Sequence, residues 1–258
     1  MKRMLPFAAA ALLLSGCTHY YYSPNNLNIP ILQKQHDASI SIGRYRGGEI
    51  RGMEVQAIYS PLKYTGVMFN HVKIPRNQNG DSSHDAEWGR GRLTEGGIGG
   101  YWPHYPFTLS LFGGYGSGWV ENSYEHLDRG ITLPGSLSAR LEFRRWFVQP
   151  SVGFRLKWFR VGVGMRRVFL NYIQGDIDYL IDPMELASVR NIEAKGRFKF
   201  WETGFSIGCY FNEGSLTFNK VSLHSRRDKL EADFQFNSYA WNLALSLNIH
   251  EIWRKEDE

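Results

Sequence analysis

The sequence predicts an all-β protein, a closed antiparallel up-and-down transmembrane β-barrel of about ten strands. Apolar residues alternate with small or polar ones over most of the chain after Asp37. Short and long connections between these segments alternate along the chain. The chain has 27 Gly and 15% aromatic residues, yet its mean hydropathy is only −0.37. That combination is typical of a barrel in which only alternate residues face lipid.

The alternation is clearest near the C-terminus. One face carries Tyr239, Trp241, Leu243, Leu245, Leu247 and Ile249, and the other carries Ala240, Asn242, Ala244, Ser246 and Asn248. Because successive side chains of a strand point to opposite faces, this strand is apolar on one side and small or polar on the other. Its length of about ten residues fits a tilted strand that spans a bilayer.

The other predicted strands follow the same rule. Segment 107–119 alternates Phe, Leu and Tyr with Thr, Ser and Gly, and segments 148–156, 159–165 and 203–211 behave alike. A helical turn around residues 182–186 is the one helix candidate. We expect strands at approximately 37–46, 49–60, 63–75, 87–102, 105–121, 137–156, 158–173, 197–211, 215–225 and 232–250.

The connections indicate a topology. Residues 60–63, 102–106, 157–158 and 212–214 form short turns, and residues 76–86, 122–136 and 174–196 form longer polar loops. Short turns at one end and long loops at the other are typical of outer-membrane barrels, whose long loops face outward. An even strand number places the N- and C-termini together on the short-turn side, which would be periplasmic. A soluble β-sandwich is the alternative, but it explains the asymmetric loops less well.

The N-terminus predicts a lipoprotein. Met1-Lys2-Arg3 is basic, and the apolar run from Leu5 to Leu14 is too short to span a bilayer as a helix. The run ends in Leu14-Ser15-Gly16-Cys17, which resembles the bacterial lipobox. We therefore expect a signal peptide at 1–16, lipidation of Cys17 with diacylglycerol and acyl chains such as palmitate, a lipidated tether at 17–35 and an outer-membrane barrel at 36–258. Thr18 in place of Asp favours sorting to the outer membrane of a Gram-negative cell.

The charge balance excludes some partners. The formal net charge of +5 falls to 28 − 25 = +3 when the signal peptide removes Lys2 and Arg3. Basic residues are scattered along the sequence, so no nucleic acid is expected to bind. The expected partners are outer-membrane lipid and other outer-membrane proteins, the latter through the loops at 76–86 and 174–196. With Cys17 lipidated, Cys209 has no partner for an intrachain disulfide.

Several segments together resemble the small outer-membrane β-barrel lipoproteins of Bacteroidota-type bacteria. They are the lipobox, the Tyr/Pro/Asn-rich stretch ending in Leu27-Asn28-Ile29-Pro30-Ile31-Leu32, and the segments Phe112-Gly113-Gly114-Tyr115-Gly116 and Phe147-Val148-Gln149-Pro150-Ser151-Val152-Gly153. The resemblance covers nearly the whole chain. It implies the barrel and the membrane anchor, and it assigns no functional residues.

The predicted lumen should be charged. A barrel of about ten strands is narrow enough to be filled largely by side chains. Opposite charges there should pair, because an isolated charge in a confined lumen is unfavourable. We expect a charge network that rigidifies the barrel, with a narrow pore for small polar solutes as the alternative. The residues expected to point inward are Glu54, Gln56, Glu142, Arg155, Arg160, Arg166 and Glu202.

No catalytic or cofactor site is predicted. Ser123, Glu125 and His126 share one loop and His84-Asp85 lies in another, but neighbours in a loop are not a pre-positioned triad. An enzyme acting on lipid A or phospholipid is therefore the less favoured alternative. The 8 His show no metal-ligand spacing, and the glycine runs precede no helix. The expected role is structural or interactive, for example as an accessory subunit of an outer-membrane complex.

Overall fold

The computed structural model describes residues 20–48, 50–78, 88–124, 127–128, 131–132, 137–177, 187–211, 214–226 and 228–248. The predicted signal peptide and Cys17 lie outside these residues, as do His84-Asp85, Glu125 and His126.

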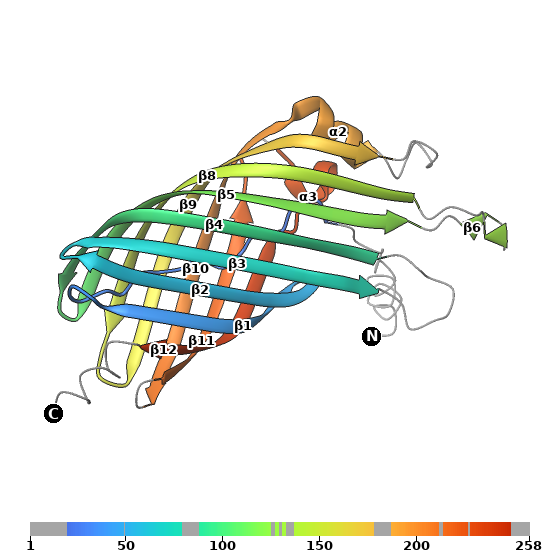
Figure 1. Cartoon of the computed structure of the whole chain (residues 1–258). Helices are drawn as coiled ribbons and strands as arrows, with labels where there is room; N and C mark the ends of the chain where they lie inside the picture. Colours follow the sequence, from blue (N-terminus) through green and yellow to red (C-terminus); the bar gives the residue numbers. More distant parts are fainter. Residues whose placement is uncertain are drawn as a thin grey trace, which may run out of the picture.

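Ten long antiparallel strands form one closed barrel, which confirms the predicted fold class (Figure 1). Each strand pairs with its neighbours along the chain, and β1 pairs with β12 to close the sheet, for example Ile42 opposite Leu245. Closure satisfies every sheet edge, which is the condition for a sheet to sit in hydrocarbon. The barrel strands are β1 (Ala38–Gly47), β2 (Ile50–Leu62), β3 (Thr65–Gln78), β4 (Trp88–His104), β5 (Phe107–Tyr124), β8 (Leu137–Arg155), β9 (Phe159–Ile177), β10 (Arg197–Phe211), β11 (Gly214–His224) and β12 (Tyr239–Asn248).

The last predicted strand was expected to begin at residue 232, but β12 begins at Tyr239. Residues Leu230–Phe234 instead form the short helix α3, whose Leu230 and Phe234 are buried. A second helix, α2 (Ala187–Lys195), precedes β10. Both helices lie at one end of the barrel (Figure 1). A two-stranded ladder, β6 (Leu127–Asp128) with β7 (Ile131–Thr132), lies between β5 and β8 in the chain.

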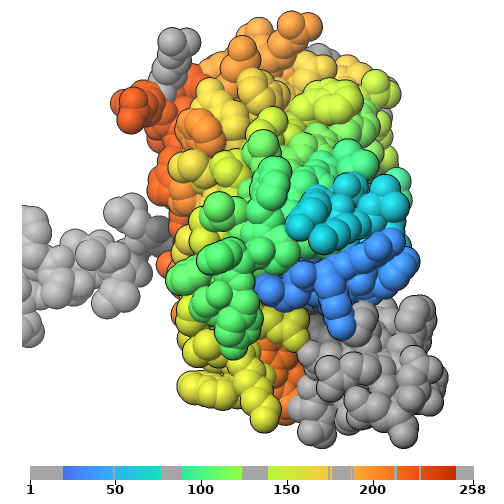
Figure 2. Space-filling model, turned by 90° about the vertical axis from the view of Figure 1, so that its left-hand side faces the viewer, coloured from blue at the N-terminus to red at the C-terminus, as the bar shows by residue number. Residues whose placement is uncertain are grey.

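The two ends of the barrel differ as predicted. At one end the strands are joined by short turns at 63–64, 105–106, 156–158 and 212–213. At the other end, four of the five connections are longer, at 79–87, 125–136, 178–196 and 225–238. We call these the short-turn end and the long-loop end. Figure 2 looks at the short-turn end, where blue residues from the early part of the described chain lie beside cyan and green ones.

The outer face carries the apolar belt that a lipid-facing barrel requires. Its side chains are exposed to between 37% and 63%, although they are aliphatic or aromatic. Such a band is far larger than the apolar patches that soluble monomers expose. Its members include Ile40, Ile42, Val67, Phe69, Ile98, Leu109, Leu111, Val152, Val163, Ile207, Leu216, Phe218, Leu243, Leu245 and Leu247.

The interior is layered. At the long-loop end, Phe198, Phe200 and Phe236 pack with both helices in one apolar cluster. Toward the short-turn end, Met68 and Phe112 belong to a second apolar cluster. Charged and amide side chains lie between the two clusters. No helix within the described residues is long and apolar enough to cross a bilayer.

A charge placed on the belt should destabilise the protein according to its depth. Leu245→Arg, in the middle of the belt, is expected to lower the free energy of unfolding in phosphatidylcholine vesicles by about 2–4 kcal/mol. Tyr239→Arg, at the end of the same face, should cost about 0–1 kcal/mol. Denaturant titrations followed by tryptophan fluorescence measure both. Equal effects of the two substitutions would contradict a lipid-facing belt.

Candidate functional site

Residues 20–33 run through the lumen of the barrel. Their side chains or backbone form hydrogen bonds with β1, β2, β3, β4, β5, β8, β9 and β10. A segment that touches eight strands of a closed ten-stranded sheet lies inside it. Residues 17–35 were predicted as an extended tether, and the structure places residues 20–33 inside the barrel. We call residues 20–33 the luminal segment.

The luminal segment runs from the long-loop end to the short-turn end. Near its start, Asn122 at the end of β5 donates a hydrogen bond to the backbone carbonyl of Tyr20 over 3.3 Å. Near its end, Gln33 donates to Thr108 at the start of β5 over 2.8 Å. Tyr20 and the end of β12 therefore lie at opposite ends of the barrel. The prediction that both ends of the chain share the short-turn side is wrong for the described chain, because it ignored a return through the lumen.

Apolar residues of the luminal segment fit against glycines of the barrel wall. A Cβ atom on Gly162 would lie 2.7 Å from Cγ2 of Ile29, and one on Gly153 would lie 2.6 Å from Cγ1 of Ile31. Real Cβ atoms do not approach carbon so closely, so these two positions need glycine. The strand glycines at these levels thus make room for the luminal segment.

Four charged side chains form the centre of the lumen, and all four are fully buried. Arg145 on β8 donates through Nε to Glu95 on β4 over 2.9 Å. Arg166 on β9 donates to Glu95 over 2.9 Å and to Glu202 on β10 over 2.6 Å. Nη1 of Arg145 lies 3.7 Å from Glu202. Two acids and two bases neutralise one another, which is the condition for burying them.

The luminal segment completes this charge network. The hydroxyl of Tyr22 donates to Glu202 over 2.6 Å and accepts a hydrogen bond from Arg145. Nδ2 of Asn25 donates to Glu95 over 2.8 Å, and its Oδ1 accepts from Arg166 over 2.8 Å. Asn25 thus bridges an acid and a base with one amide. These hydrogen bonds hold the charged side chains and the luminal segment in position relative to each other.

A second buried carboxylate binds the segment without a cation. Glu54 on β2 accepts from the backbone N–H of Asn26 over 3.0 Å and from its Nδ2 over 2.7 Å. Gln56 and Asn242 also donate to it. Within the described residues Glu54 forms no ion pair, so amides alone replace its hydration. Gln56 donates in addition to the carbonyl of Asn26 over 2.9 Å.

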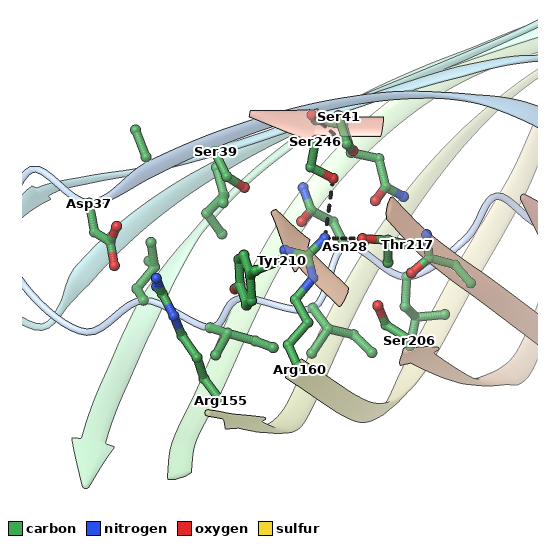
Figure 3. A pocket seen from close by; sticks show the side chains of 18 residues that line it. Asn28, Asp37, Ser39, Ser41, Arg155, Arg160, Ser206, Tyr210, Thr217 and Ser246 are labelled. Atoms are coloured by element: carbon green, nitrogen blue, oxygen red, sulfur yellow. Dashed lines mark hydrogen bonds between the residues drawn. The ribbon is translucent and has the colours of Figure 1, made fainter. Parts of the chain in front are cut away.

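Arg155, the last residue of β8, and Arg160, near the start of β9, lie close to the short-turn end. Both line a cavity of about 50 Å³ between the luminal segment and the wall (Figure 3). Arg160 donates to Ser246 over 3.2 Å and to Thr217. The guanidinium of Arg155 lies 4.9 Å from the ring centre of Tyr210. Both arginines were predicted to point inward, and the structure places them there, although outside the central network.

The prediction for Glu142 is wrong. Its side chain is 45% exposed on the outer face, where Arg140 donates to it over 2.9 Å. The cause is parity, because odd-numbered residues of this part of β8, such as Phe143 and Arg145, face inward. Glu54, Arg166 and Glu202 lie in the lumen as predicted, but only Arg166 and Glu202 pair with each other. Glu95 and Arg145 were missed, although alternation offered a signal: Arg145 shares the polar face of Gln149 and Ser151, and Glu95 lies on the face opposite to Ile98.

The proposed hydrolytic residues do not form a site within the described part of the chain. Ser123 is buried and its hydroxyl has no hydrogen-bond partner there. The described residues contain no group of three or more His, Cys, Asp or Glu side chains able to hold a metal ion. The arrangement that the structure does show is a neutral, dry network, which suits a fixed plug.

No protein-family model and no curated protein matches the sequence. Among solved structures, the outer membrane protease OmpT from Escherichia coli is similar at 10% identity and a TM-score of 0.45, over 83% of this chain and 94% of that one. A major outer membrane protein from Thermus thermophilus is similar at 10% identity and a TM-score of 0.40, over 82% and 98%. Likeness of this degree carries no statement about activity.

The buried network should behave as a coupled unit. Arg145→Met leaves two acids with one base, and we expect it to lower the free energy of unfolding by about 3–5 kcal/mol. Adding Glu95→Gln restores neutrality, so the double variant should lose less than the sum of the two single variants, with a coupling of about 1–3 kcal/mol.

Arg140 and Glu142 provide the matched control, since they form an exposed pair on the same strand at 2.9 Å. Their coupling in an equivalent cycle should be about 0–1 kcal/mol. Unfolding in denaturant, followed by the gel mobility of the folded barrel, measures both cycles. Equal coupling in the two cycles would contradict the network.

Proposed function

We propose that this chain is an outer-membrane lipoprotein whose barrel is closed by its own N-terminal segment, and that its role is structural or interactive. The hydrogen-bonded luminal segment is the observation that carries the proposal. A plug bound by Glu54, Glu95, Arg166 and Glu202 cannot leave without exposing buried charge. The barrel is thus built to hold a peptide in place.

A plugged lumen argues against the pore alternative. On the long-loop side of the central network, the ring centre of Tyr22 lies 5.2 Å from that of Phe200 and 5.4 Å from that of Phe236. On the short-turn side of the network, Leu32 packs in the apolar cluster that contains Phe112. The cavity beside Arg160, at about 50 Å³, has room for little more than water. Ions would therefore meet apolar layers on both sides of the network.

The path of the luminal segment also bears on the lipid anchor. Cys17 precedes Tyr20 by three residues, which span at most about 11 Å. A lipid on Cys17 would then enter the leaflet at the long-loop end. If the long loops face outward, as in outer-membrane barrels, that leaflet is the outer one. We accordingly propose a surface-side anchor in place of the predicted periplasmic one.

The long-loop end would serve as the contact surface. It carries α2, α3 and the long connections, and the anchor would hold it close to the membrane plane. Loops on a rigid scaffold commonly carry binding. We propose that other outer-membrane proteins bind there, and that the chain is a lipoprotein of the Bacteroidota type that its sequence resembles and acts as an accessory subunit of an outer-membrane complex.

Conductance tests the plug. The wild-type protein in planar lipid bilayers is expected to give no current steps. The variant Tyr22→Ala/Asn25→Ala/Asn26→Ala removes the anchors of the luminal segment, so it should show fluctuating current. Lys34→Ala/Gln35→Ala, which changes exposed residues beyond the segment, should stay silent. Steady conductance of the wild-type protein would refute the proposal that the luminal segment blocks the lumen.

Distance measurements test the direction of the segment. Spin labels at Cys17 and Arg46→Cys, in an unlipidated Cys209→Ser protein, should lie close together. Labels at Cys17 and Lys63→Cys should be farther apart by roughly 20–30 Å, the height of tilted strands of this length. Double electron–electron resonance gives both distances. The reverse order would place Cys17 at the short-turn end and remove the surface-side anchor.

A further inference from the structure

Basic side chains encircle the outer face just beyond the apolar belt. On β1, exposed Ile40 and Ile42 are followed toward the long-loop end by exposed Arg44 and Arg46. The same change from apolar to basic recurs on β2, β3, β4, β8, β10 and β11, whereas on β9 exposed Phe169 and Ile173 lie beyond Arg167. We call these residues the basic ring, which consists of Arg44, Arg46, Arg51, Lys73, Arg92, Arg144, Arg167, Lys199 and Lys220, on β1, β2, β3, β4, β8, β9, β10 and β11.

Strand register places several of these residues beside one another or beside a tryptophan. Lys220, Trp241, Arg46 and Arg51 are successive lateral partners across β11, β12, β1 and β2. Lys73 lies opposite Arg92, and Arg92 lies opposite Trp119. On the far side, Arg167 lies opposite Trp201. Trp119, Trp201 and Trp241 thus lie beside cations of the basic ring.

Within the described residues, no acidic side chain compensates the charge of the basic ring. The outward-facing acids of the strands whose side chains are described are Glu121 and Glu142, and they pair with Arg90 and Arg140. None of the nine ring residues forms an ion pair within the described part of the chain. Arg46 with Arg51 and Lys73 with Arg92 are like charges directly opposite each other, which destabilises a sheet. An external anion would remove that repulsion.

Tryptophans mark the depth of the ring. The guanidinium groups of Arg90, Arg92 and Arg140 lie 5.7, 5.8 and 4.7 Å from the ring centre of Trp119. Arg167 lies 5.1 Å from that of Trp201. Tryptophan and long basic side chains share a preference for the headgroup layer, where their stems cover apolar surface. The basic ring therefore lies at the level of lipid headgroups.

The other rim is different. Many of its exposed outward side chains are aromatic, with Leu62, His104 and Cys209 among them, and the exposed lysines Lys34, Lys63 and Lys157 lie outside the strands. The asymmetry indicates two leaflets of different charge. A compact soluble anion or a nucleic acid could not reach cations spread over eight of ten strands, whereas the lipids that surround a barrel do.

We propose that the basic ring binds the phosphate groups of anionic lipids, of the phosphorylated lipid A type, in the leaflet at the long-loop end. Arginine, which makes up six of the nine residues, presents paired N–H donors that match phosphate oxygens. The inference needs the barrel to span a membrane. It depends neither on lipidation of Cys17 nor on the luminal segment.

Lipid binding to the purified protein in dodecyl maltoside tests the proposal. Native mass spectrometry with bis-phosphorylated lipid A should show several bound molecules, fewer at high salt, and few with the same lipid lacking phosphates. The variant Arg46→Gln/Lys73→Gln/Arg92→Gln should weaken lipid A binding by about 100-fold, since each basic residue near an anionic surface contributes about fivefold. The matched variant Lys34→Gln/Lys63→Gln/Lys157→Gln should change it less than threefold.

Thermal unfolding in the same detergent shows whether each variant is folded. Because like-charge repulsion is relieved, the ring variant should melt at the same temperature as the wild-type protein or higher, as read from gel mobility. Equal binding of phosphorylated and phosphate-free lipid, or equal losses in the two triple variants, would overturn the proposal. A failure of the plug experiments above would leave these results unaffected, so the two proposals fail separately.

Discussion

Neutralisation of buried charge is the constraint on which the structure depends. Glu95, Arg145, Arg166 and Glu202 lie fully buried in the middle of a barrel whose outer face is apolar. Such a cluster is tolerated only when acids match bases and the remaining donors and acceptors are satisfied. The barrel strands supply the charges, and Tyr22 and Asn25 supply part of the remaining hydrogen bonds. The luminal segment in its place therefore stabilises the folded barrel.

From this constraint follow the closed lumen and the direction of the chain. Tyr22 lies on the long-loop side of the network and Leu32 on its short-turn side. The luminal segment therefore enters at the long-loop end, and β1 starts at the opposite end. The proposed lipid on Cys17 and the proposed lipid contacts of the basic ring then share one side of the membrane. Interior and exterior thus have different chemistry: the central charge network is neutral, whereas the basic ring on the outer face forms no ion pair within the described residues.

The strands could be predicted from sequence because apolar residues alternate with small or polar ones along most of their length. Alternation of Leu243, Leu245 and Leu247 with Ala244 and Ser246 fixes both the strand and its lipid-facing side. The luminal segment could not be predicted, because residues such as Asn25 and Pro30 read equally as a tether, and its partners lie far away in sequence. Glu142 was misplaced because charge was taken as a sign of the lumen. Near the rim of a barrel the outer face also carries charged residues. There, the alternation of residues along the strand decides whether a side chain faces the lumen or the outside.

Hydrogen exchange of the backbone amides of residues 20–33 tests the central claim most directly. The segment has no strand ladder of its own, so any protection must come from burial and from the network around it. In the folded protein in detergent, we expect the amides near Asn25 and Asn26 to exchange as slowly as those in the middle of β4 and β9. Exchange at the rate of an unstructured peptide, with the strands still protected, would show that the lumen does not hold the segment and would contradict the account.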